Sequence, residues 1–128
     1  MKILLDTQAF IWFVENDKLL YKNLKKIIEN NSNTILISIA SLWEMTIKIS
    51  LGKLKLNFSI EEMMKKITEN GFDILPILPK HLIKLSQLEQ YHNDPFDRII
   101  ISQGLTDDLI IISSDDKFDY YKVNRLWK

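Results

Sequence analysis

The sequence predicts an α/β fold in which helices cover both faces of a parallel sheet. Strand-like and helix-like runs alternate along the 128 residues. The strand-like runs, such as residues 3–5 and 109–112, are apolar throughout and lack the polar alternation of a half-exposed strand. No Gly-, Pro- or Ser-rich stretch resembles a linker. We therefore expect a single domain over residues 1–128.

The N-terminal third of the chain contains two predicted strands and two predicted helices. Residues 3–5 form a short apolar strand that ends at an acid, and residues 7–14 place aromatic side chains at helical positions. Residues 19–30 have leucines and isoleucines on one helical face and lysines on the other. An asparagine-rich turn then leads to a second apolar strand at residues 34–38.

The middle of the chain predicts two helices and a third strand. A helix over residues 38–51 is closed by Gly52, a residue suited to ending helices. After a lysine-rich loop, residues 59–69 show amphipathic helical spacing. An Asn-Gly pair ends that helix, and residues 72–75 form a short strand before a proline.

The C-terminal third begins with a helix at residues 80–88 and contains the clearest helix start. Asp94 is a good cap and Pro95 is favoured at the first helical position, so a helix begins there and fades near Gly104. Residues 109–112 are the most strand-like run in the chain. A short helix and a strand complete the predicted fold.

The composition excludes several classes of protein. Hydrophobic residues make up 46% of the chain and cysteine is absent, which excludes a disordered chain and a disulfide scaffold. Because 17 Lys and Arg balance 17 Asp and Glu, nucleic acid is not bound by bulk positive charge. No apolar run approaches a membrane span, and an acid follows too early for a secretory signal. We expect a cytoplasmic protein with no membrane association.

Four acidic residues have ordinary explanations when each is taken alone. Asp6 could cap a helix, and Asp97 could interact with a helix dipole. Glu44 could form a capping box with Ser41 or a surface ion pair with Lys48. The fourth acid, Asp115, could belong to a polar loop.

The predicted topology gives these acids a shared location. Asp6 and Asp115 both follow strands, and the carboxyl ends of parallel strands meet at one edge of a sheet. Right-handed crossovers can bring Glu44 and Asp97 to the same edge. Clustered carboxylates repel unless a cation lies between them, and oxygen ligands suit Mg²⁺ or Mn²⁺. Such a centre supports phosphodiester hydrolysis by metal-activated water.

The acids also lie in segments that resemble the PIN domain, and more narrowly the VapC-type toxins of type II toxin–antitoxin systems. These segments are ILLDT at residues 3–7, SIASLWE at 38–44 followed by Lys48 and GKL, DPFDR at 94–98, and SSD at 113–115. The resemblance implies a three-layer α/β/α fold with a parallel sheet in the order 3-2-1-4-5. It also implies a Mg²⁺- or Mn²⁺-dependent endoribonuclease that cleaves RNA, is inhibited by a cognate antitoxin protein, and forms a homodimer.

The resemblance assigns roles to individual residues. It implies that the metal ligands are Asp6, Asp97 and Asp115, with Glu44 binding metal directly or through water. The hydroxyls of Thr7 and Ser113 would steady these ligands.

The sequence departs from the family pattern in places. Gln8 stands where relatives often carry His, and Ser113 stands where Thr is more usual. Asp116 adds a second acid beside Asp115 and leaves open which of them coordinates, although the motif favours Asp115.

Other residues have competing interpretations. Three basic residues are candidates for contact with the RNA backbone, namely Lys48, Lys53 and Arg98. The alternative for the two lysines is that they belong to a solvated surface, and the alternative for Arg98 is a surface ion pair. His92 lies two residues before Asp94 and could reach the crevice, but a loop histidine is more often solvated than catalytic, so it is not assigned a role. His81, at a helix start, has less claim to a site role. The apolar residues expected in core stripes are Trp12, Trp43, Met63 and Met64.

Two other functions compete with the nuclease. A catalytically inactive PIN-like module could keep the fold and act by binding or regulating a partner, although all four acids are intact. A phosphoacceptor signalling domain also places acids at strand ends, but it needs an acidic pair after the first strand. Only Asp6 is present there.

Overall fold

The computed structural model describes residues 1–128 and contains a five-stranded parallel sheet in the order β3-β2-β1-β4-β5. Strand β1 (Lys2–Leu5) is central and pairs with β2 (Thr34–Ser38) and β4 (Ile110–Ile112). The edges are β3 (Asp73–Leu75) and β5 (Asn124–Leu126). The predicted α/β class and the strand order 3-2-1-4-5 are confirmed.

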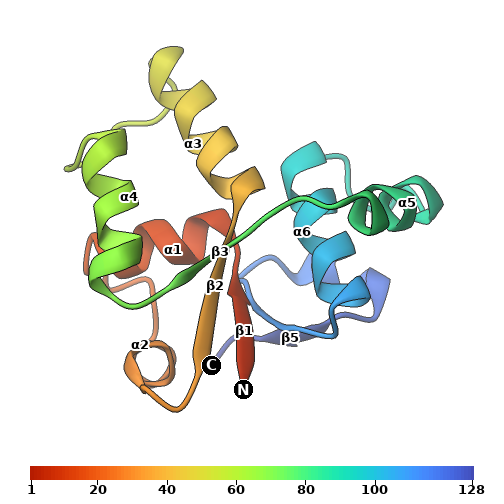
Figure 1. Cartoon of the computed structure of the whole chain (residues 1–128), viewed down its shortest axis with the longest axis horizontal. Helices are drawn as coiled ribbons and strands as arrows, with labels where there is room; N and C mark the ends of the chain where they lie inside the picture. The colour runs from red at the N-terminus through yellow and green to blue at the C-terminus, as the bar shows by residue number, and fades with distance from the viewer.

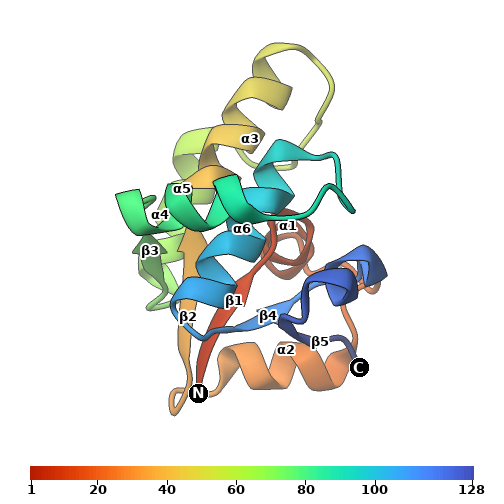
Figure 2. The same ribbon diagram turned by 90° about the vertical axis from the view of Figure 1, so that its right-hand side faces the viewer.

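Helices cover both faces of the sheet (Figures 1 and 2). One face carries α1, α2 and α4, and the other carries α5, α6 and the 3₁₀ helix η1, while α3 leaves the end of β2 and extends beyond the sheet. None of these helices is both long and apolar enough to cross a membrane. Their bounds are α1 (Thr7–Val14), α2 (Lys22–Glu29), α3 (Ile39–Ser50), α4 (Ile60–Glu69), α5 (Pro79–Gln87), α6 (Pro95–Thr106) and η1 (Asp116–Tyr121).

The core divides into two parts, one on each face of the sheet. Ile3 and Leu5 of β1 join the larger apolar cluster with α1, α2 and α4, whereas Leu4 joins the smaller cluster with α6 and η1. All three side chains are fully buried. Successive side chains of a strand point to opposite faces, so a central strand covered on both sides is apolar at every position.

Two local expectations are wrong. The helix predicted from residue 19 begins at Lys22, because the side chain of Asp17 accepts the Leu19 amide at 2.9 Å and forms a turn first. The capping box of Ser41 with Glu44 does not form. Ser38 is the cap of α3, with its hydroxyl accepting the Ala40 amide at 3.0 Å, which places Glu44 inside the helix.

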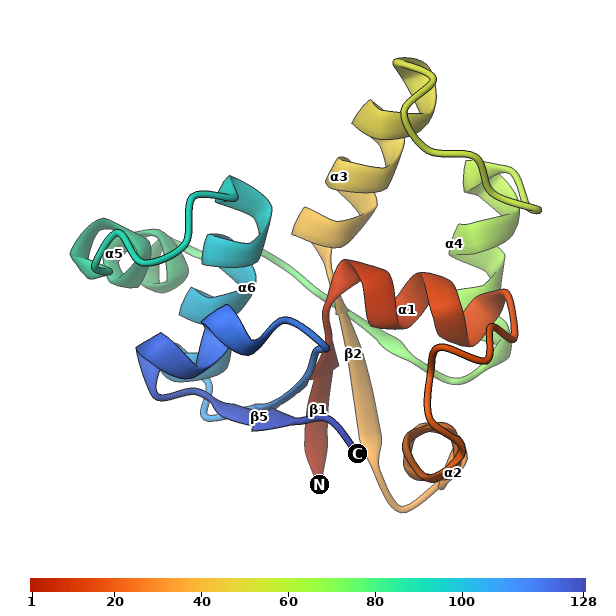
Figure 3. The same cartoon turned by 180° about the vertical axis from the view of Figure 1, so that it is seen from behind.

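The carboxyl ends of β1 and β4 meet the first turns of α1 and α6 at one edge of the sheet (Figure 3). Helix α6 begins there because Pro95 occupies its first turn and the Asp94 carboxylate accepts the amides of Phe96 and Asp97 at 2.9 and 3.0 Å. Helix α3 contacts both α1 and α6. This edge therefore brings together four segments that are distant in sequence.

Candidate metal centre

A pocket of about 240 Å³ opens at this edge, and all four predicted acids line it. Asp6 caps α1 directly after β1, and Asp97 lies in the first turn of α6. Glu44 belongs to α3, and Asp115 follows β4 as the cap of η1. The structure thus unites carboxylates from four separate segments.

A larger hollow of about 670 Å³ lies at the opposite, amino edge of the sheet. It is lined by acids and lysines together, and Lys80 lies 2.8 Å from Asp107 in an ion pair. Two lysines offset most of the charge of its three acids, so the smaller pocket, where five acids meet one lysine, is the stronger candidate for a functional site.

Asp6 is almost fully buried in the acidic pocket. One of its oxygens accepts the Ala9 amide at 2.8 Å. Burial raises the pKa of Asp6 to about 6, aided by the charges of Asp115 and Glu44, although hydrogen bonds from the Ser113 hydroxyl and the Ala9 amide act against the rise. The pocket therefore disfavours the ionised carboxylate.

Asp97 is affected more strongly by the same surroundings. Burial raises its pKa to about 8, and the neighbouring charges of Asp94, Asp6, Glu44 and Asp115 add to the effect. Without a cation, this side chain retains a proton near neutral pH. A divalent ion at this position would relieve the mutual repulsion of the carboxylates.

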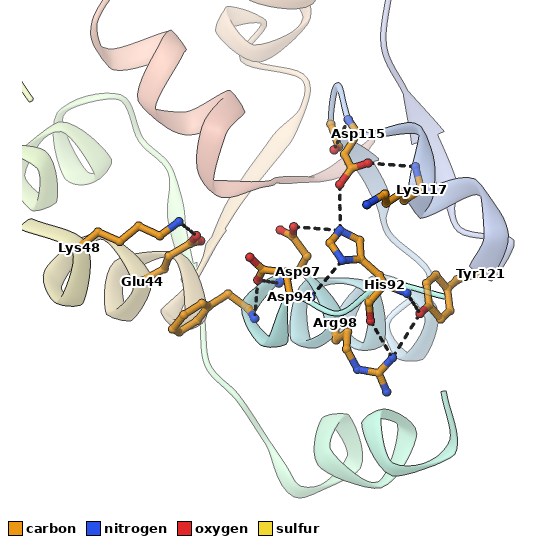
Figure 4. A network of polar contacts seen from close by, with 11 residues as sticks. Glu44, Lys48, His92, Asp94, Asp97, Arg98, Asp115, Lys117 and Tyr121 are labelled. Carbon is orange, nitrogen blue, oxygen red and sulfur yellow. Dashed lines mark hydrogen bonds and ion pairs between the residues drawn. The ribbon is translucent and has the colours of Figure 1, made fainter. Parts of the chain in front are cut away.

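Glu44 provides a direct indication of a missing partner. It is 6% exposed, and its Oε2 accepts the Lys48 ammonium at 2.6 Å (Figure 4). Its Oε1 is buried and has no hydrogen-bond partner. A buried carboxylate oxygen without a partner is costly, so it is suited to accept a ligand. An all-oxygen set of this kind fits Mg²⁺ or Mn²⁺.

His92 is a site residue that the sequence interpretation missed. It was expected to be solvated, but it is 7% exposed. Its Nε2 lies 2.8 Å from Asp115 Oδ2 and 3.1 Å from Asp97 Oδ2 (Figure 4). Ligand atoms of these three residues all lie within 4.8 Å of one another. The only sequence signal was the position of His92 two residues before the helix cap Asp94.

The two predicted hydroxyls lie beside the acids. The Thr7 hydroxyl donates to the Ser41 hydroxyl at 2.8 Å and joins the start of α1 to α3. Ser113 accepts the amide of Asp115 at 3.0 Å, and its hydroxyl acts to lower the pKa of Asp6. Of the two adjacent acids, Asp115 lines the pocket, whereas Asp116 is exposed and lies outside the lining. Gln8 also lines the pocket.

The predicted basic residues behave differently from one another. Lys48 lines the pocket, and Lys53 is exposed next to Leu54, another lining residue. Arg98 is 8% exposed, and its guanidinium donates to the Glu89 carbonyl at 2.9 Å. The surface ion pair of Arg98 does not form, because the guanidinium is enclosed and bonded to the loop before α6. The same enclosure leaves little of the guanidinium exposed for the predicted RNA contact.

Core predictions for the apolar residues hold only in part. Met63 is fully buried, but Met64 is 42% exposed and Trp43 is 53% exposed. The Trp43 ring lies edge-on to Phe96, with centroids 5.1 Å apart. His81 is completely buried, so it too departs from an ordinary surface histidine.

Comparisons with known proteins agree with this geometry. A family model described as the PIN domain matches residues 3–124. The structure of VapBC2 from Rickettsia felis bound to a DNA fragment from their promoter contains a similar chain, with a TM-score of 0.76, 18% identity and 100% of both chains covered.

Two further solved structures contain similar chains. The structure of FitAB bound to an IR36 DNA fragment gives a TM-score of 0.69 and 19% identity, covering 97% of this chain and 93% of that one. The structure of FitAcB from Neisseria gonorrhoeae gives a TM-score of 0.63 and 19% identity, covering 97% of this chain and 96% of that one. At these identities the likeness shows the fold. A search of curated proteins finds no match.

Proposed function

The chain belongs to the PIN domain family, and we propose that it is a metal-dependent endoribonuclease, the toxin of a type II toxin–antitoxin system. The observation that carries the proposal is the convergence of four carboxylates in one pocket, where Glu44 Oε1 is buried without a partner. The proposed reaction is hydrolysis of RNA phosphodiester bonds.

The ligands proposed for Mg²⁺ or Mn²⁺ are Asp6, Glu44, Asp97 and Asp115. A bound divalent ion supplies an acidified water and stabilises charge that develops on a phosphate. The Lys48 ammonium donates a hydrogen bond to Glu44 Oε2, which leaves Glu44 Oε1 free to bind the ion. Asp97, whose pKa is raised to about 8, must lose its proton when the ion binds.

The proposed RNA substrate is held by local charge, since the chain is neutral overall. Lys48 is 42% exposed at the pocket, and Lys53 lies on the adjoining loop. We propose that both contact phosphates that flank a scissile bond. The similarity to chains in the VapBC2 and FitAB structures supports a cognate antitoxin as the protein partner. We propose that the active form is a homodimer.

The nuclease proposal predicts cleavage of single-stranded RNA that requires Mg²⁺ or Mn²⁺, stops with EDTA and returns when the ion is restored. Asp6→Asn should lower the cleavage rate by more than about 100-fold, since the ion supplies several kcal/mol of transition-state stabilisation. A gel assay with labelled RNA measures both effects. Circular dichroism establishes that the variant remains folded.

Asp116→Asn is the matched control, because this acid is exposed beside Asp115 and outside the pocket. It should cleave at the wild-type rate. Equal rates for Asp6→Asn and wild type would contradict the assignment. A wild-type protein that binds no Mn²⁺ in calorimetry would instead indicate the inactive binding module.

A further inference from the structure

The imidazole of His92 is held between a backbone amide and two carboxylates. The amide N–H of Asp94 donates to His92 Nδ1 at 3.1 Å, so this nitrogen acts as an acceptor and carries no proton. The ring proton is therefore on Nε2, which lies 2.8 Å from Asp115 Oδ2 and 3.1 Å from Asp97 Oδ2. A nitrogen that donates a proton has no lone pair to offer a metal ion.

We propose that His92 is a positioning residue of the metal centre and not one of its ligands. Its Nε2–H donates to Asp115, and the same nitrogen lies 3.1 Å from Asp97 Oδ2, so the imidazole sets the spacing of two carboxylates from different elements. Asp97 Oδ1 is left for the ion, whereas Asp115 Oδ1 accepts the Lys117 amide at 3.0 Å and has its second lone pair left for the ion. This inference rests on the proposed function, because it takes Asp97 and Asp115 as ligands of a divalent cation.

The surrounding residues hold the imidazole in place. Its ring lies edge-on to Phe118, with centroids 5.9 Å apart. The His92 amide donates to the Tyr121 hydroxyl at 2.7 Å, and its carbonyl accepts Arg98 at 3.3 Å (Figure 4). Arg98 Nη1 also lies 3.2 Å from that Tyr121 hydroxyl. The buried Arg98 therefore fixes the loop that carries His92.

His81 shows the same bonding pattern away from the pocket. Its Nδ1 accepts the Leu78 amide at 2.9 Å, and its Nε2 lies 3.0 Å from Asp107 Oδ2. This arrangement joins the start of α5 to the end of α6, and His81 does not line the acidic pocket. The two histidines make the same kind of connection, but only the carboxylates bonded to His92 belong to the proposed metal centre.

Nitrogen-15 NMR of the histidine rings tests which nitrogen carries the proton. We expect the Nε2–H form of His92 in the metal-free protein and in the protein saturated with Mg²⁺. A proton on Nδ1, or loss of the Nε2 proton when Mg²⁺ is added, would overturn the proposal, because Nε2 would then be free to coordinate.

Calorimetry with Mn²⁺ tests the positioning role. His92→Leu should weaken Mn²⁺ binding by about 10- to 100-fold, as expected when a group that orients metal ligands is removed. His92→Gln should recover most of the affinity, because its amide can donate to the carboxylates and accept the Asp94 amide. His81→Leu, the matched control, should lower the melting temperature and leave the Mn²⁺ affinity at the wild-type value.

The possible failures are distinguishable when affinity is measured at a temperature where every variant is folded. Wild-type affinity in His92→Leu, or equal losses in His92→Leu and His92→Gln, would overturn the positioning role alone. A wild-type protein that binds neither Mn²⁺ nor Mg²⁺ would overturn the proposed function and the positioning role together.

Discussion

Asp97 carries a large electrostatic cost in the metal-free protein. Its pKa of about 8 exceeds its ordinary value of 3.8, so the folded chain holds a proton that the unfolded chain has released. As pH rises from about 4 to 8, this difference disfavours the folded state increasingly. This buried acid therefore lowers the stability of the metal-free fold, as expected for a proposed ligand of a divalent ion.

Replacing Asp97 with Asn removes this ionisation and keeps a group of similar shape. We expect Asp97→Asn to raise the free energy of unfolding of the metal-free protein at pH 8 by about 1–3 kcal/mol, and to have little effect near pH 4. Urea denaturation in EDTA at both pH values measures the change. Mn²⁺ binding should be lost in the same variant. An Asn variant that is no more stable than wild type at pH 8 would contradict the electrostatic account.

At the residue scale, the sequence allowed the acids to be predicted but not the groups around them. Asp6 and Asp115 follow apolar runs directly, so a general rule about strand ends places them at one edge. The burial of His92 and Arg98 depends on Tyr121 and on loop carbonyls that only the tertiary fold brings near. The prediction that Trp43 lies in the core is wrong. Its aromatic side chain predicts burial, whereas its position on α3 leaves it 53% exposed.

At the scale of elements, α6 must approach β4 closely for Asp97 to reach the pocket. Gly104 permits that approach. A Cβ atom at this position would lie 2.5 Å from Cδ1 and 3.0 Å from Cγ1 of Ile111, a fully buried residue of β4. At position 104 the close packing of α6 on β4 therefore favours glycine, although glycine has a low helix propensity.

Gly104→Ala should therefore destabilise the protein. Alanine favours a helix by about 1 kcal/mol over glycine, but overpacking a core costs about 1–3 kcal/mol. We expect a net loss of about 1 kcal/mol or more in the free energy of unfolding, measured in urea. Ile111→Val removes the atom in closest contact, so the double variant should be more stable than the sum of the two single changes predicts. Strict additivity would show that the contact does not limit the packing.

Element positions were predictable because apolar runs and caps are local signals, and the departures have local causes as well. The Ser59–Glu62 capping box begins α4 one residue inside the predicted span, with both reciprocal hydrogen bonds present. Helix α3 has two candidate caps, Ser38 and Ser41. Ser38 is the cap because β2 ends at this residue, a boundary that no sequence motif indicates. Strand order, by contrast, came from the family resemblance, since periodicity alone does not specify which strands pair.

At the scale of the whole molecule, equal numbers of acids and bases conceal an uneven distribution. Five of the 17 acids, the four proposed ligands and Asp94, line one pocket in which Lys48 is the one cationic residue. Bound divalent metal would neutralise much of this local charge and make the proposed RNA-binding surface more cationic. The neutral composition is therefore compatible with a nucleic-acid substrate held at one site.

The same distribution predicts how stability changes with pH. In the metal-free protein the pKa values of Asp6 and Asp97 are raised to about 6 and about 8, against an ordinary 3.8. Between about pH 4 and 8 the folded state thus binds more protons than the unfolded state, and the free energy of unfolding falls as pH rises. Asp107 acts in the opposite direction, because its pKa is lowered by hydrogen bonds from Lys80 and His81, which outweigh its burial. The stabilisation that ionised Asp107 provides is lost only as the pH falls below its ordinary pKa of 3.8.

Divalent metal should reverse this trend, because the ion binds the ionised carboxylates of the folded state alone. At about 100 times the dissociation constant, binding adds about 2.7 kcal/mol to the free energy of unfolding. Protons compete with the ion at low pH, so the rise in melting temperature caused by Mg²⁺ should be several degrees at about pH 8 and much smaller at about pH 5. Thermal melts in MgCl₂ and in EDTA at both pH values measure it, with Asp97→Asn as the variant that should lose the effect. An equal Mg²⁺ shift at both pH values, or metal-free stability that increases with pH over this range, would show that the buried carboxylates do not govern the stability of the molecule.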